Sequence, residues 1–119
     1  MGQDAIAENK APVSCHLVAF EQAVIRTREI GGPLLVVSGT APHTNMEVFL
    51  SHRIYDEGKK PEWWGIEVVG ALPGGVCLDE TKRFETAMPV SRVSGLRGIE
   101  VIGADHTLRL TVEPDANDI

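Results

Sequence analysis

The chain has 119 residues, of which 43% are hydrophobic and 24% are charged, and its formal net charge at pH 7 is −6. This length fits a single domain, and it is enough to bury a core without a metal ion or a disulfide. The acidic balance argues against a nucleic-acid-binding protein, because phosphate binding needs a clustered basic surface. For the same reason we expect no binding to an anionic membrane.

The two ends of the chain are polar and lack periodicity, so residues 1–11 and 114–119 are predicted to be disordered tails around one domain, residues 12–113. The start of the chain has neither the basic residues nor the apolar run of a signal peptide. We therefore expect a cytoplasmic protein in which Cys15 and Cys77 are reduced thiols. A disulfide between them is the alternative if the chain has lost a leader peptide.

The first predicted element covers residues 16–30, where the β-branched Val24, Ile25 and Thr27 favour strand over helix. This segment is predicted to be two strands or one long bent strand. Residues 33–40, rich in valine and leucine, form the next strand.

Residues 46–55 and 63–72 alternate between apolar and polar side chains, which is typical of half-buried strands. In the first of these strands the apolar face is predicted to carry Met46, Val48, Leu50, His52 and Ile54. In the second, Trp64 shares its face with Ile66, Val68 and Leu72. Because neighbouring side chains on a strand point to opposite faces, Trp64 is predicted to enter the core and Trp63 to face outward.

Residues 84–91 read as a weaker strand, in which Pro89 suits a sheet edge or a bulge. Residues 98–103 and 106–113 are predicted to pair as a hairpin around Ala104 and Asp105, with Leu108, Leu110 and Val112 facing inward. Seven or eight short strands separated by glycine and proline turns indicate an all-β fold, a two-sheet antiparallel β-sandwich.

The broad layout resembles the immunoglobulin-like architecture, with short strands and a late hairpin. The detailed immunoglobulin signature is absent: no tryptophan lies about a dozen residues after Cys15, and position 75, two before Cys77, is glycine rather than tyrosine. The resemblance is to an architecture, and an architecture does not carry a function.

Pairing of strands 46–55 and 63–72 would gather an unusual set of side chains on their outer face: Phe49, Arg53, Tyr55, Trp63 and Val69. An exposed aromatic patch containing an arginine is typical of an interaction site. The patch predicts a non-catalytic module that binds a protein partner or a second copy of itself. Alternatively, Trp63 and Tyr55 stack on a carbohydrate or another small ligand. A third possibility is that a loop or the N-terminal segment covers the patch as a second small core.

Other candidate sites have weaker patterns. On the alternating strand His52 and Glu47 point to opposite faces, which separates them as metal ligands for a site with His43. Nothing in the spacing of Cys77, His16 and His106 indicates a nucleophile and its base. The acidic loops at 56–62 and 79–85 also contain lysine and arginine, which favours a solvated surface over a calcium site. We therefore predict no catalytic residue, metal or cofactor.

Overall fold

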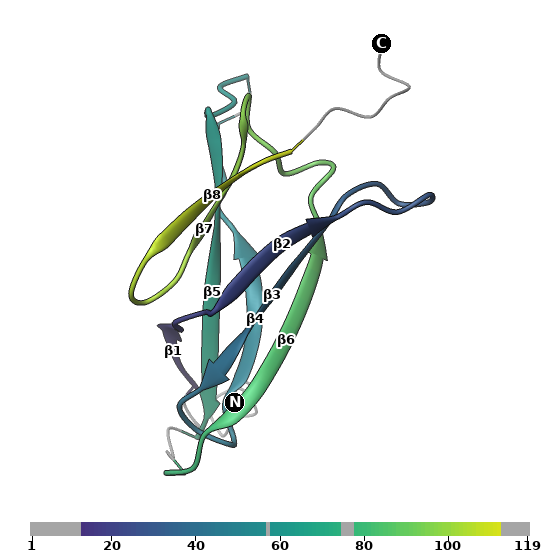
Figure 1. Ribbon diagram of the computed structural model, residues 1–119. Helices are drawn as coiled ribbons and strands as arrows, with labels where there is room; N and C mark the ends of the chain where they lie inside the picture. The colour runs from purple at the N-terminus through teal and green to yellow at the C-terminus, as the bar shows by residue number, and fades with distance from the viewer. Residues whose placement is uncertain (1–12, 57, 75–77, 113–119) are drawn as a thin grey trace, which may run out of the picture.

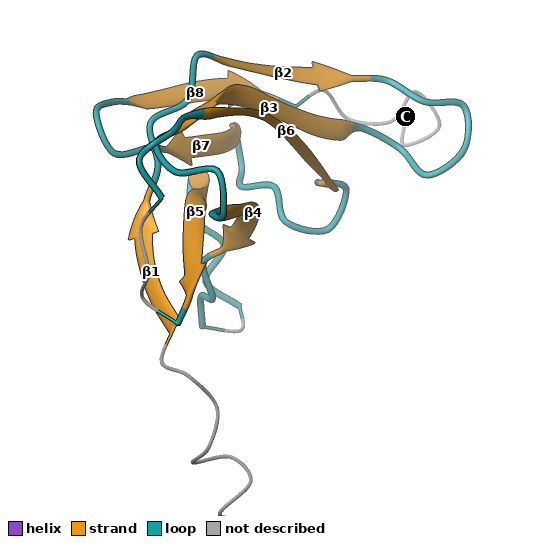
Figure 2. Ribbon diagram, turned by 90° about the horizontal axis from the view of Figure 1, so that it is seen from below, coloured by secondary structure: helices purple, strands orange, loops and turns teal. Residues whose placement is uncertain are grey.

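The computed structural model describes residues 13–56, 58–74 and 78–112. The predicted tails and Cys77 lie outside this part of the chain. Within it all regular structure is β, in two sheets, as the alternation predicts. Figure 2 shows the three-stranded sheet as a layer over the β1–β5–β4 part of the larger sheet.

Sheet B is the smaller, purely antiparallel sheet, with strand order β2-β3-β6. Its strands are β2 (Gln22–Arg26), β3 (Leu34–Ala41) and β6 (Lys82–Pro89). The predicted edge position of Pro89 is confirmed, because β6 is an outer strand of this sheet.

Sheet A contains the other five strands. They are β1 (Val13–Leu17), β4 (Glu47–His52), β5 (Trp63–Pro73), β7 (Gly98–Ile102) and β8 (Thr107–Thr111). The long strand β5 pairs with β4 along one edge, and its other edge is shared by β1 and β7 (Figure 1). The β5–β7 pair is parallel, which corrects the prediction of two purely antiparallel sheets. The path of the chain explains this pairing. After β5 the chain crosses to sheet B and forms β6, and it then returns to sheet A as β7, which runs in the same direction as β5.

The core lies between the two sheets and is built by alternate residues of the central strands. Its largest fully buried side chains are those of Leu35, Ile66, Ile99, Val37, Val68, Val90 and Val101. Trp64 packs against this core while Trp63 points to the other side of β5, as predicted. No polar or charged side chain among the described residues is buried, so packing of apolar groups defines the interior.

Four further expectations have mixed outcomes. The segment 16–30 contains all of β2 but only the last two residues of β1, which begins earlier than predicted, at Val13; the two strands lie in different sheets. The β7–β8 hairpin is confirmed, with the Gly103 amide donating to the carbonyl of His106 across the turn. The inward placement of Ile54 is wrong: this side chain is 89% exposed, because β4 ends at His52 and the chain leaves the sheet. Leu108 is also exposed, at 37%, because β8 is the outermost strand of sheet A.

Candidate functional site: the outer face of sheet A

The outer face of sheet A is the side of β5 that points away from sheet B. At its centre, Val69 lies directly opposite Leu17 of β1 on one side and Phe49 of β4 on the other. Leu17 is 40% exposed and Phe49 is 42% exposed. Three apolar residues therefore form one cross-strand row facing solvent, which we call the apolar row.

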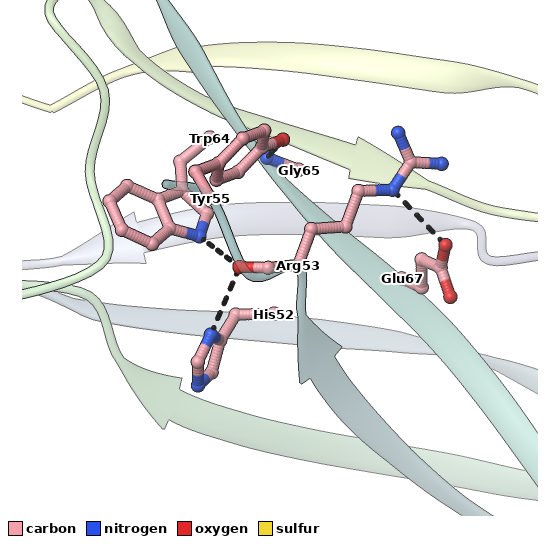
Figure 3. A network of polar contacts seen from close by, with 6 residues as sticks. All are labelled: His52, Arg53, Tyr55, Trp64, Gly65 and Glu67. Atoms are coloured by element: carbon pink, nitrogen blue, oxygen red, sulfur yellow. Dashed lines mark hydrogen bonds and ion pairs between the residues drawn. The ribbon is translucent and has the colours of Figure 1, made fainter. Parts of the chain in front are cut away.

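Four residues before Val69 in β5, at Gly65, the chain of β4 leaves the sheet and side chains complete the hydrogen bonding (Figure 3). The Arg53 amide donates to the carbonyl of Gly65 at 2.9 Å, as in a regular ladder. The return bond is different, because the Gly65 amide donates to the Tyr55 hydroxyl at 3.0 Å. The carbonyl of Arg53 instead accepts from the indole N–H of Trp64 at 2.8 Å. Tyr55 also packs edge-on against Trp64, with ring centroids 5.1 Å apart.

The side chain of Arg53 lies over Gly65. A Cβ at Gly65 would come within 2.8 Å of Arg53 Cδ and 3.2 Å of the Tyr55 hydroxyl, so the glycine leaves room for both side chains. From this position Arg53 Nε reaches Glu67 Oε2 at 3.2 Å. The glycine therefore lets the side chain of Arg53, the residue that follows β4, lie against β5.

A second arginine approaches β5 from the opposite side. Arg109 of β8 donates from Nε to Glu100 Oε1 at 3.1 Å. Its guanidinium carbon lies 5.2 Å from the ring centroid of Trp63, within the range of a cation–π contact. The half-buried Trp63 ring is thus covered in part by Arg109, which explains how a tryptophan is accommodated on this face.

Between these two arginines the surface is shallowly hollowed. The depression is lined by Arg53, Glu100, Ile102, Thr107 and Arg109. It is open to solvent, and its lining combines two guanidinium groups, one carboxylate, one hydroxyl and the apolar Ile102. The outer face of sheet A therefore has two parts, the apolar row and a charge-balanced half that carries two Arg–Glu pairs.

The structure places the five predicted residues in three neighbouring positions on this face. Phe49 and Val69 are cross-strand partners, Arg53 and Tyr55 gather around Gly65, and Trp63 lies under Arg109. Sequence reasoning missed Leu17, Glu100 and Arg109, since it placed only β4 beside β5. Nothing in the local sequence shows that β1 and β7 share the second edge of that strand.

The weaker candidates do not assemble into a site. Within the described ranges no three His, Cys, Asp or Glu side chains lie close enough together to hold a metal ion. His43 is hydrogen-bonded through Nδ1 to the carbonyl of Leu78 at 2.8 Å, and His52 faces the edge of Trp64. Cys15 is exposed on β1, while Cys77 lies outside the described residues.

The outer face of sheet B carries a smaller polar cluster. Arg83 donates to Glu21 at 2.6 Å and to the Thr40 hydroxyl at 3.0 Å, and Thr40 in turn donates to Glu21. The Arg83 guanidinium first, and then the Thr40 hydroxyl, lower the pKa of the Glu21 carboxyl below its ordinary value. These hydrogen bonds tie Thr40 of β3 to Arg83 of β6 and to Glu21, which precedes β2.

Comparison with family models, with curated proteins and with solved structures gives no match to this chain. In the described part of the chain there is no helix of the length and apolarity that crossing a bilayer requires.

Proposed function

We propose that this protein is a non-catalytic assembly module that associates with a second copy of itself through the outer face of sheet A. The observation that carries the proposal is the apolar row, because Leu17, Val69 and Phe49 present adjoining apolar surface to water. Burying such surface is the main favourable term in protein association.

The charges on this face suit a second copy of the chain. The whole molecule has a net charge of −6, so two copies repel each other on average. The Arg53–Glu67 and Arg109–Glu100 pairs balance their charges locally, and the face therefore offers both signs to an identical partner. A two-fold interface requires this kind of self-complementarity.

The test is a substitution in the middle of the row. Phe49→Asp places a charge in the buried part of the interface and should weaken dimerisation by about 2 kcal/mol or more, roughly thirtyfold in Kd. Sedimentation equilibrium over a range of concentrations measures the effect. Leu108→Asp is the matched control, because Leu108 is similarly exposed at 37% and lies on the opposite side of sheet A. A wild-type chain that stays monomeric, or a Phe49→Asp variant that still dimerises, would refute the proposal.

A second candidate function is binding of a small polar ligand such as a carbohydrate. The depression between Arg53 and Arg109 favours it, since its lining presents guanidinium donors, a hydroxyl and the carboxylate of Glu100. The rings needed for stacking are engaged, however: Arg109 covers Trp63, and Tyr55 packs on Trp64. A saturable change in tryptophan fluorescence with a saccharide, without any change in mass, would favour this candidate over self-association.

A further inference from the structure

The depression on the outer face of sheet A lies along one cross-strand row of residues. Strand pairing puts Gly65 of β5 beside Glu100 of β7, and Glu100 beside Arg109 of β8. Arg53 lies on the other side of Gly65, where its amide donates to the carbonyl of that glycine. The row therefore has an arginine at each end and a carboxylate between them.

The two guanidinium groups lean inward from the ends of this row. The backbone positions of the two arginines are three strand spacings apart, about 14 Å. The side chain of Arg109 crosses the width of β7, because its guanidinium carbon lies 5.2 Å from the ring centroid of Trp63 on β5. Arg53 reaches β5 from the other edge, with its Nε 3.2 Å from Glu67 Oε2. Both arginines consequently line one depression.

Each of the two guanidinium groups is held through a single nitrogen atom. Arg53 donates from Nε to Glu67 (Figure 3), and Arg109 donates from Nε to Glu100. Within the described residues neither arginine donates from Nη1 or Nη2 to another side chain or to the backbone. A fork of guanidinium N–H groups matches the two oxygens of a carboxylate. The glutamates therefore fix the direction of both side chains and leave two forks for carboxylates from outside the chain.

The rest of the lining offers a carboxylate oxygen and a hydroxyl. Glu100 uses Oε1 for Arg109, and its Oε2 accepts no hydrogen bond from the part of the chain that the structure describes. Thr107 adds a hydroxyl to the same depression. The charged groups of the lining are two arginines and one glutamate, so their charges sum to +1.

We propose that this depression binds a small α-amino dicarboxylate, the class of compound to which free L-glutamate and L-aspartate belong. One carboxylate of the ligand accepts from the Nη groups of Arg53, and the other accepts from those of Arg109. The ammonium group of the ligand donates to Glu100 Oε2. The ligand thus matches the lining group by group, and its net charge of −1 is opposite to that of the lining.

Charge separates this class of ligand from its alternatives. A neutral carbohydrate would leave both guanidinium forks without an anionic partner. A dicarboxylate without an amino group, or inorganic phosphate, would bring only negative charge next to Glu100, in a chain whose total charge is already −6. The ammonium group turns the contact with Glu100 from a repulsion into an attraction.

The first experiment is an NMR titration of the full chain with L-glutamate and L-aspartate. The matched ligands are glutarate and succinate, which lack only the amino group. We expect saturable shifts at the amides of Glu100, Thr107 and Arg109, with a Kd on the order of 1 mM for an amino dicarboxylate. The ligand without the amino group should bind at least about fivefold more weakly. Tryptophan fluorescence should follow the same curve, because Trp63 lies beneath Arg109.

Two results of this titration overturn the proposal. The first is the absence of saturable shifts with both amino dicarboxylates. The second is equal binding of glutarate, succinate or inorganic phosphate, because Glu100 would then have no role in recognition.

The second experiment removes one guanidinium fork. Arg109→Gln should weaken binding of the amino dicarboxylate by at least about tenfold. Arg83→Gln on sheet B is the matched control, because Arg83 is also paired with a glutamate and its side chain is 64% exposed, against 60% for Arg109. The control should bind like the wild type, and circular dichroism checks that both variants are folded. An Arg109→Gln variant that binds like the wild type contradicts the proposal.

A third variant tests the contact with the amino group. Glu100→Gln keeps an acceptor for Arg109 but removes the negative charge, so the affinities for L-glutamate and glutarate should become nearly equal. A preference for L-glutamate that stays as strong as in the wild type would show that the ammonium group is bound elsewhere, and the assignment would be wrong.

Ligand binding is independent of self-association, because the apolar row lies outside the lining of the depression. The Phe49→Asp variant should therefore bind the amino dicarboxylate at least as tightly as the wild type. A wild-type chain that is monomeric and binds the ligand refutes self-association alone. A chain that dimerises through the apolar row but binds no amino dicarboxylate, either as wild type or as Phe49→Asp, refutes the ligand site alone.

Discussion

Tyr55 and Trp64 complete the β4–β5 ladder with side-chain atoms at the point where the backbone of β4 turns away. The hydroxyl of Tyr55 accepts from the Gly65 amide, and the indole of Trp64 donates to the carbonyl of Arg53. Each of the two adjacent tryptophans is therefore explained: Trp64 packs on the core with its N–H satisfied, and Trp63 faces outward beneath Arg109. Two adjacent tryptophans on one strand thus have different roles, because one packs on the core and the other forms part of the outer surface.

Removing the hydroxyl of Tyr55 tests this arrangement. Tyr55→Phe keeps the ring against Trp64 but leaves the part-buried Gly65 amide without its acceptor, which should cost about 1 kcal/mol in the free energy of unfolding. Urea unfolding measures the loss, and amide hydrogen exchange should be faster at Gly65. The amide of Arg53, which donates to the backbone of Gly65, is the internal control. Unchanged exchange at Gly65 would show that the hydroxyl is not its acceptor in solution.

At the scale of the element, the connection 90–97 is an ordered bridge rather than a loose loop. Its Leu96 and Arg97 amides donate to the carbonyls of Pro61 and Glu62, which extends the parallel β5–β7 pairing past the start of both strands. Gly95 permits this close approach, because a Cβ there would lie 2.4 Å from the carbonyl oxygen of Glu62 and 2.5 Å from that of Pro61.

Gly95→Ala should therefore destabilise the protein by about 1–3 kcal/mol, because its methyl group meets backbone atoms that cannot move independently. Thermal and urea unfolding measure the effect. Gly58→Ala is an informative contrast: its φ of 82° makes alanine strained, but no atom lies within 4 Å of the new methyl group. We expect a smaller loss there, of about 1–2 kcal/mol. A Gly95→Ala variant as stable as the wild type would mean that the bridge is not formed.

The strands and their faces were predictable from the sequence because alternation is a local signal. It correctly placed Phe49 and Val69 outside and Ile66 and Val68 inside. The partners of β5 along its second edge were not predictable, since β1 and β7 are far from it in sequence and no local pattern encodes that choice. This is why the candidate site omitted Leu17 and Arg109, although both lie on the same face.

At the scale of the whole molecule, β5 connects strands from both ends of the chain. The β1–β5 and β5–β7 pairs join residues that are far apart in sequence, and chains dominated by such pairings fold slowly. Sheet A cannot assemble until β5 is in place, whereas β2 and β3 already form a hairpin with a short connection.

Refolding kinetics test this dependence. The only two tryptophans of the chain are the first two residues of β5, so their fluorescence reports on the docking of this strand. After dilution from urea we expect the fluorescence change on the order of milliseconds to seconds, together with the main β-sheet signal in circular dichroism. A native fluorescence signal reached within microseconds would contradict a rate set by long-range pairing.

The same feature has a consequence during synthesis. In a chain emerging from the ribosome, β1 and β4 are completed before β5. The backbone of these two strands of sheet A therefore stays unpaired at a stage when β2 and β3 can already pair with each other. Unpaired strands are the segments that other chains join most readily. A pause in translation before β5 has emerged from the ribosome would prolong that interval, whereas a pause after it has emerged would give both strands time to pair with it.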